Sequence, residues 1–162
     1  MIKTALTSAP VLRHFDPALR TAVHIDASQN AVGAVLLQWQ PGESHPRPVA
    51  FMSRKISGAQ YRYDARNVEA LATQMVLNTW CTILMGVPSE MYSDHDSLKY
   101  LFTQKAPSQR ILHLCEFLAD YDFQEIKYVP GPENVVPDFL SLPWDSTPST
   151  PPIHMLTMPM PR

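Results

Sequence analysis

The chain has 162 residues, of which 45% are hydrophobic and 17% charged, and its formal net charge is −2 at pH 7. These values are typical of one globular domain with a substantial core and exclude a disordered chain. No apolar run approaches the roughly 18 residues of a membrane span, so we expect no membrane partner. The near-neutral charge excludes tight nucleic-acid binding by overall positive charge, so any such role needs a local patch or a neighbouring domain.

The first part of the chain predicts a short lead-in segment followed by three strands. Residues 1–20 hold an apolar stretch and the turn-like HFDPALR. Alternating, β-branched sequence then predicts strands at about 21–27, 31–39 and 47–53. The links between the strands are the polar turn SQN and the Pro/Gly turn PGESHP. We therefore expect an antiparallel meander of three strands.

The hydrophobic period then changes from that of a strand to that of a helix. From about Asp64 to Met85, apolar residues recur at i, i+3 and i+4, and Gly86 and Pro88 end this predicted helix. The remaining predicted elements are a strand at 89–94, helices at 96–104 and 108–121, a strand at 123–129 and a brief helical turn within 130–142. This order predicts an α/β fold with a mixed five-stranded sheet flanked by helices.

The chain beyond this pattern is different in composition. Residues 143–162 hold six of the 16 prolines and show no periodicity, so we expect a disordered tail. The predicted organisation is therefore a lead-in at 1–20, a folded domain at 21–142 and a tail at 143–162. Cys81 and Cys115 fall inside helical patterns without metal-ligand spacing, which fits a reducing compartment such as the cytoplasm.

Four carboxylates occupy positions where they could meet. Asp26 and Asp94 end apolar strands, and if these strands are parallel neighbours both side chains lie at the same end of the sheet. Glu69 opens the apolar stripe of the long helix, and Asp138 follows the last strand. Such a cluster repels itself unless divalent cations hold it, and Mg²⁺ prefers oxygen ligands. Two ions about 3.5–4 Å apart are suited to phosphodiester hydrolysis.

Each carboxylate also has a plainer interpretation. Asp26 fits a turn residue and Glu69 a solvated helix residue. Asp94 fits a turn or cap residue, and Asp138 an ordinary residue of a Pro-rich stretch. Spacing alone does not decide between these interpretations and a metal site.

Local motifs add a resemblance that covers nearly the whole predicted fold. The segments HIDAS, EALA, SDHDSL and NVVPDFLSL, with HPRPVAFMSRKISGAQYRY between the first two, stand in one order along the chain. From about Leu6 to Trp144 the sequence resembles the ribonuclease H domain of gypsy-type LTR retrotransposon reverse transcriptase polyproteins. The resemblance implies the ribonuclease H-like fold, with a five-stranded mixed sheet in the order 3-2-1-4-5.

The same resemblance implies an activity, a metal and site residues. The implied reaction is hydrolysis of the RNA strand of RNA–DNA hybrids, with two Mg²⁺ ions, or Mn²⁺ in their place. The implied catalytic and metal-binding residues are the carboxylates of the four motifs: Asp26, Glu69, Asp94 and Asp138. For the hybrid we expect contacts from the first turn and from nearby cations, namely Ser28, Asn30, Gly33, Arg54, Lys55 and Lys99.

The resemblance also bears on the wider protein. In the family a reverse transcriptase domain lies upstream, and no polymerase-type motif precedes Thr21, so we expect a fragment of a polyprotein. Its expected location is the cytoplasm, with a virus-like particle or the nucleus as alternatives. Pro137 replaces the family's alanine before Asp138, which together with the near-neutral charge favours an alternative function. That alternative is a catalytically silent domain acting as a spacer or protein-interaction module. An integrase-like nuclease fits poorly, because Glu69 lies between the two aspartates in sequence.

Overall fold

A computed structural model describes residues 12–28, 30–56, 65–94 and 109–129, together with Val136 and Leu140. The predicted helix at 96–104 and the predicted tail at 143–162 lie outside these residues. Within them, no helix is long and apolar enough to span a membrane.

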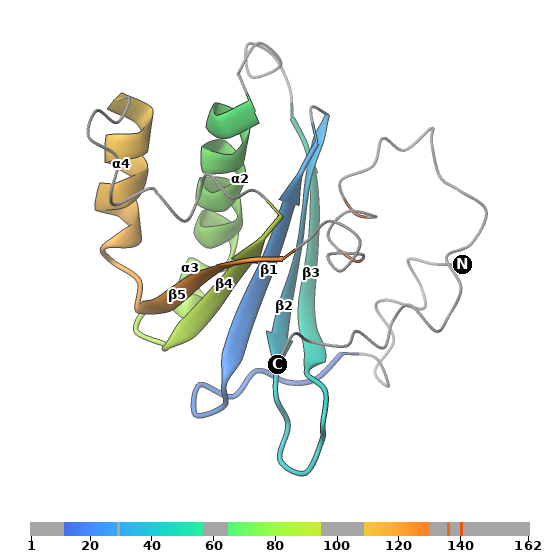
Figure 1. Ribbon diagram of the computed structural model, residues 1–162. Helices are drawn as coiled ribbons and strands as arrows, with labels where there is room; N and C mark the ends of the chain where they lie inside the picture. Colours follow the sequence, from blue (N-terminus) through green and yellow to red (C-terminus); the bar gives the residue numbers. More distant parts are fainter. Residues whose placement is uncertain are drawn as a thin grey trace, which may run out of the picture.

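Five strands form one mixed sheet in the order β3-β2-β1-β4-β5 (Figure 1). The strands are β1 Thr21–Ala27, β2 Ala31–Gln38, β3 Arg47–Lys55, β4 Ser89–Ser93 and β5 Phe123–Tyr128. The pairs β1–β2 and β2–β3 are antiparallel, whereas β1–β4 and β4–β5 are parallel. The meander, the mixed sheet and the strand order expected from the sequence are confirmed.

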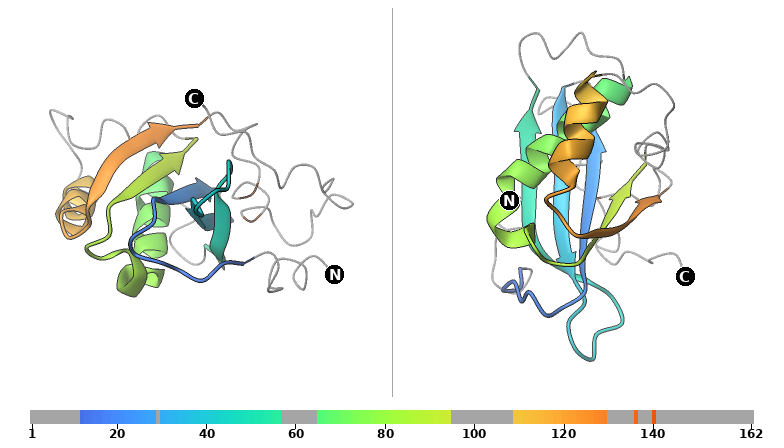
Figure 2. Two further views of the ribbon diagram at one scale, coloured as in Figure 1. Left: turned by 90° about the horizontal axis from the view of Figure 1, so that it is seen from below. Right: turned by 90° about the vertical axis from the view of Figure 1, so that its left-hand side faces the viewer.

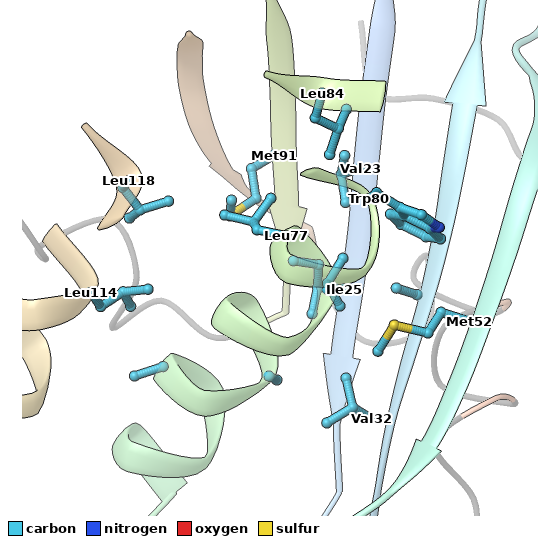
Figure 3. Packing of buried hydrophobic residues seen from close by; sticks show 14 of the residues in the cluster. Val23, Ile25, Val32, Met52, Leu77, Trp80, Leu84, Met91, Leu114 and Leu118 are labelled. Carbon is cyan, nitrogen blue, oxygen red and sulfur yellow. The ribbon is translucent and has the colours of Figure 1, made fainter. Parts of the chain in front are cut away.

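Within the described residues, three helices cover one face of the sheet (Figure 2): α2 Ala65–Thr79, α3 Cys81–Leu84 and α4 Gln109–Leu118. Because successive strand residues point to opposite faces, Val23 and Ile25 of β1 face these helices. Both pack in the main core with Leu77 of α2 and Leu114 of α4 (Figure 3). Burying each such side chain stabilises the fold by about 1.5–3 kcal/mol.

The other face of the sheet, called here the second face, carries a smaller apolar cluster. Its buried members are Ala22, Val35, Leu37, Tyr92 and Val129, with Trp39, Phe51 and Val136 packed against them. Alternation along β1 places His24 and Asp26 on the same face as Ala22. The second face therefore combines a small core with polar side chains.

The single helix expected at 64–85 is wrong in one respect, because the structure has two helices with a break at Trp80. The amide of Trp80 still donates to the carbonyl of Val76 at 3.0 Å, but its backbone leaves the helical conformation, with φ −109° and ψ 19°. The carbonyl of Trp80 accepts from the amide of Leu84 at 2.9 Å and so begins α3. Trp80 is buried in the main core. The apolar pattern continues through both helices, so periodicity did not reveal the break. Gly86 then takes a left-handed φ of 74°, consistent with its expected role as a helix stop.

Residues 12–20 are tied to the sheet. The fully buried amide of Gln38 donates to the carbonyl of Asp16 at 2.7 Å, and its oxygen accepts from the Asp16 amide at 3.0 Å. The amide of Trp39 donates to the carbonyl of Arg20 at 3.1 Å. This segment thus packs as part of the fold, while the exact boundaries 1–20, 21–142 and 143–162 stay predictions.

Candidate active site

Asp26 and Asp94 lie at the same end of the sheet. The parallel register places Ile25 opposite Ser93, and each aspartate is the next residue along its strand. Asp26 is buried and Asp94 is half-buried. The expectation that parallel neighbours bring these two carboxylates together is met, and we call this end the carboxylate end of the sheet.

Glu69 joins them from the helical layer. It lies on α2, which packs against β1, and its side chain is only 1% exposed. Burial, and to a smaller extent the nearby charges of Asp94 and Asp26, raise the pKa of its carboxyl to about 9. Three of the four expected carboxylates therefore share one electrostatic environment.

The donor set suits a divalent cation. A buried carboxyl with a pKa near 9 keeps its proton at neutral pH unless a positive charge stabilises the ionised form. Three carboxylates from separate segments provide the oxygen ligands that Mg²⁺ and Mn²⁺ prefer. Within the described residues, however, no group of three or more Asp, Glu, His or Cys is arranged to hold a metal ion by itself. Asp138, the fourth expected ligand, lies outside the described residues, so a cation site here needs more than these three side chains as they stand.

The turn after Asp26 is held by Ser28. Its hydroxyl oxygen accepts hydrogen bonds from the amides of Ala31 at 3.0 Å and Asn30 at 3.2 Å. The carbonyl of Asn30 in turn accepts from the amide of Ile56 at 2.8 Å. The Ser28 hydroxyl thus orders the loop between β1 and β2. Substrate contacts by Ser28, Asn30 and Gly33 stay predictions.

Two of the expected substrate-binding cations lie at the carboxylate end. Arg54 pairs with Val32 and Lys55 with Ala31, the residues that begin β2. Both side chains are exposed, and neither forms an ion pair with another described residue. Lys99, the third expected cation, lies outside the described residues.

A charge cluster that the sequence analysis missed surrounds Glu90, the second residue of β4. Glu90 accepts two hydrogen bonds from the Arg20 guanidinium at 2.7 and 3.0 Å, one from the Tyr92 hydroxyl at 2.5 Å and one from the Lys127 ammonium at 3.1 Å. Arg20 above all, with Tyr92 and Lys127, lowers the pKa of Glu90 to about 2. The Tyr92 ring also stacks on His24, with ring centroids 4.4 Å apart.

A second omission is Ser53 of β3, whose hydroxyl donates to the carbonyl of Leu140 at 2.7 Å. The only sequence signal for it was a small polar residue at the end of an alternating strand.

Comparison with known proteins identifies the family. A family profile described as "RNase H-like domain found in reverse transcriptase" matches residues 16–121. The chain belongs to this family. This RNase H-like domain is 37% identical over 150 residues to the Transposon Tf2-3 and Tf2-4 polyproteins of Schizosaccharomyces pombe. The match covers 90% of the chain but 11% of each polyprotein, so the chain spans about a tenth of the length of these relatives. Tf2 elements are gypsy-type LTR retrotransposons, which confirms the resemblance drawn from the motifs.

Solved structures confirm the fold of this RNase H-like domain. The foamy viral protease-reverse transcriptase in complex with double-stranded DNA matches with a TM-score of 0.62 and 22% identity, over 80% of this chain and 26% of that one. The same viral protein in complex with an RNA/DNA hybrid matches with a TM-score of 0.54 and 21% identity, over 88% and 19%. RNase H1 from Halobacterium salinarum matches with a TM-score of 0.53 and 15% identity, over 75% and 92%.

Proposed function

We propose that this domain hydrolyses the RNA strand of RNA–DNA hybrids as the ribonuclease H part of a retrotransposon reverse transcriptase. The observation that carries the proposal is the buried Glu69 carboxyl, whose pKa is raised by burial and by the charges of Asp94 and Asp26. A buried group with a strongly perturbed pKa beside further carboxylates is typical of a functional site. Family membership supports the same reaction class.

The proposed ligands of two Mg²⁺ ions, or of Mn²⁺, are Asp26, Glu69, Asp94 and Asp138. Cations bound there would supply Lewis-acid activation of water and neutralise charge at the scissile phosphate. The protein's own contribution is to bring ionisable oxygens from β1, α2 and β4 to one place. Glu69 must lose its proton to act as a ligand, so metal binding at neutral pH should release a proton.

Arg54 and Lys55 are the proposed contacts for the phosphates of the hybrid. They are exposed at the carboxylate end, whereas Arg20 and Lys127 are paired with Glu90. A free cation at the site attracts phosphate more strongly than one already neutralised. An upstream reverse transcriptase domain is proposed to supply further affinity, because two such contacts give weak and salt-sensitive binding. The cytoplasmic location stays a prediction.

The test is cleavage of a labelled RNA–DNA hybrid by the purified chain at low salt with Mg²⁺ or Mn²⁺. We expect cleavage of the RNA strand alone, and its loss on addition of EDTA. Asp94→Asn should lower the rate by more than about 100-fold, since loss of even outer-shell groups at metal sites costs 10- to 100-fold. The matched control is Asp120→Asn, which changes an exposed carboxylate just after α4. Full activity in both Asp26→Asn and Asp94→Asn would exclude the proposed site.

The silent-domain alternative is separated by a second measurement. We expect Mg²⁺ to raise the melting temperature of the wild type but not that of Asp94→Asn, because a ligand stabilises the state that binds it. A metal-dependent shift without cleavage would mean that the carboxylates are sound and that affinity for the hybrid is lacking. Neither a shift nor cleavage would favour the spacer or interaction module.

The cations have their own test. Replacing Arg54 or Lys55 by alanine should reduce the slope of log binding constant against log salt concentration by about 1 each. The matched control is Arg47→Ala, at the other end of β3, where Arg47 is paired with Glu43. An equal effect of all three substitutions would show that the carboxylate end is not where phosphate binds.

A further inference from the structure

Asp26, Gly33 and Ser53 form one row across three neighbouring strands, called here a rung. In the antiparallel register Asp26 lies opposite Gly33, and Gly33 lies opposite Ser53. Directly opposed residues of antiparallel strands point to the same face, so the side chains of Asp26 and Ser53 both lie on the second face. Gly33 brings no side chain to the space between them. The rung therefore has a carboxylate at one end, a hydroxyl at the other and a glycine in the middle.

The C-terminal part of the chain is attached to this same face at two points. Val136 packs against the apolar cluster of the second face. The carbonyl of Leu140 accepts the hydrogen bond from the Ser53 hydroxyl at 2.7 Å. Both residues have helical conformation, and 87 residues separate the two partners of the hydrogen bond.

We propose that Ser53 is a positioning residue for the fourth carboxylate of the site. Asp138 stands midway in sequence between Val136 and Leu140, the two attached residues. The Ser53 hydroxyl fixes the chain two residues beyond Asp138 and does so on the rung of Asp26. In this proposal, that bond keeps the part of the chain that carries the last carboxylate near Asp26. This inference rests on the proposed function and assigns Ser53 a role that acts through Asp138.

The structure explains why a serine is suited to this position. Its hydroxyl is short and donates to a main-chain carbonyl, so the anchor does not depend on the identity of residue 140. Ser53 is exposed, so its replacement leaves the core intact.

The first experiment compares Ser53→Ala, Ser53→Thr and wild type. Ser53→Ala should raise the Mg²⁺ concentration for half-maximal cleavage several-fold and speed hydrogen exchange of the amides around Leu140. Ser53→Thr keeps the hydroxyl and should restore both values. The matched control is Ser89→Ala, which removes a similar bond, from a serine hydroxyl to the carbonyl of Val87 at 3.0 Å, at the opposite end of the sheet. It should leave the Mg²⁺ dependence unchanged even if it lowers the melting temperature.

A double-mutant cycle tests whether Ser53 acts through Asp138. If it does, Ser53→Ala should change Mn²⁺ affinity, measured by calorimetry, several-fold in the wild type and less than about twofold in Asp138→Asn. Equal effects in both backgrounds would overturn the proposal. So would unchanged hydrogen exchange in Ser53→Ala, or faster exchange with unchanged metal dependence.

The two proposals fail in different ways. A wild type that binds Mn²⁺ without cleaving any hybrid has sound carboxylates but lacks affinity for the hybrid on its own, and the Mn²⁺ cycle still decides the role of Ser53. A wild type that neither binds Mn²⁺ nor cleaves overturns both. If the wild type cleaves the hybrid and Ser53→Ala does not differ from it in any measurement, only the positioning role is overturned.

Discussion

Replacing Glu90 by glutamine should destabilise the domain at neutral pH far more than at acid pH. The carboxyl has a pKa of about 2 in the fold against an ordinary value of 4.5. A difference of 2.5 units corresponds to about 3.4 kcal/mol of stability at most. Arg20 and Lys127 are 53% and 33% exposed, so solvent screening reduces this to about 1–2 kcal/mol. Because the folded-state pKa is lowered, the contribution is complete above pH 4.5 and is lost as the pH falls towards 2.

The assay is thermal unfolding of wild type and Glu90→Gln at pH 7 and pH 3. We expect the melting temperature to fall by roughly 3–8 °C at pH 7 and by less than half as much at pH 3. The matched control is Glu43→Gln, since Glu43 also lies between two arginines, Arg13 and Arg47, but on the exposed β2–β3 loop. The reasoning is refuted if both variants lose the same stability at pH 7, or if the loss in Glu90→Gln is independent of pH.

Three further tests address the packing and the backbone. Leu114→Ala, on the buried side of α4, should cost about 2–4 kcal/mol in urea unfolding, whereas Leu112→Ala, 47% exposed on the same helix, should cost less than about 0.5 kcal/mol. Gly86→Ala should cost about 1–2 kcal/mol by thermal unfolding, because its φ of 74° is strained for a residue with a Cβ while no atom lies near the added methyl group. Gln38→Ala should release the segment around Asp16, seen as faster proteolysis there and a stability loss of about 1–3 kcal/mol; unchanged proteolysis would contradict the proposed anchoring.

Much of the fold followed from local signals. The change from alternating to helical spacing near residue 64 predicted the order of elements, and turn residues predicted the meander. The break at Trp80 did not follow, because Trp80 and Ile83 continue the apolar spacing of α2. What ends α2 is the non-helical backbone of Trp80, with φ −109° and ψ 19°, and no residue there carries a helix-stop signal before Gly86.

The candidate site was predictable only where its residues come from neighbouring strands. Asp26 and Asp94 end strands that lie side by side, so one topological assumption was sufficient to bring them together. Glu90 gave no such signal, because Arg20 and Lys127 lie 70 and 37 residues away from it in sequence. Their meeting depends on the register of three strands, which the composition of each strand does not specify.

The central place of β1 has a consequence for synthesis of the chain. Its antiparallel partner β2 follows within four residues, but its parallel partner β4 begins only at Ser89. Until then one side of an almost wholly buried, apolar strand exposes its amides and carbonyls, which can pair with strands of other chains. α2 emerges in between and packs over a face of β1, not along its unpaired side. Nascent chains that end before Ser89 should therefore be prone to aggregation, and pairing of β1 with β4 should be a late, slow step of folding.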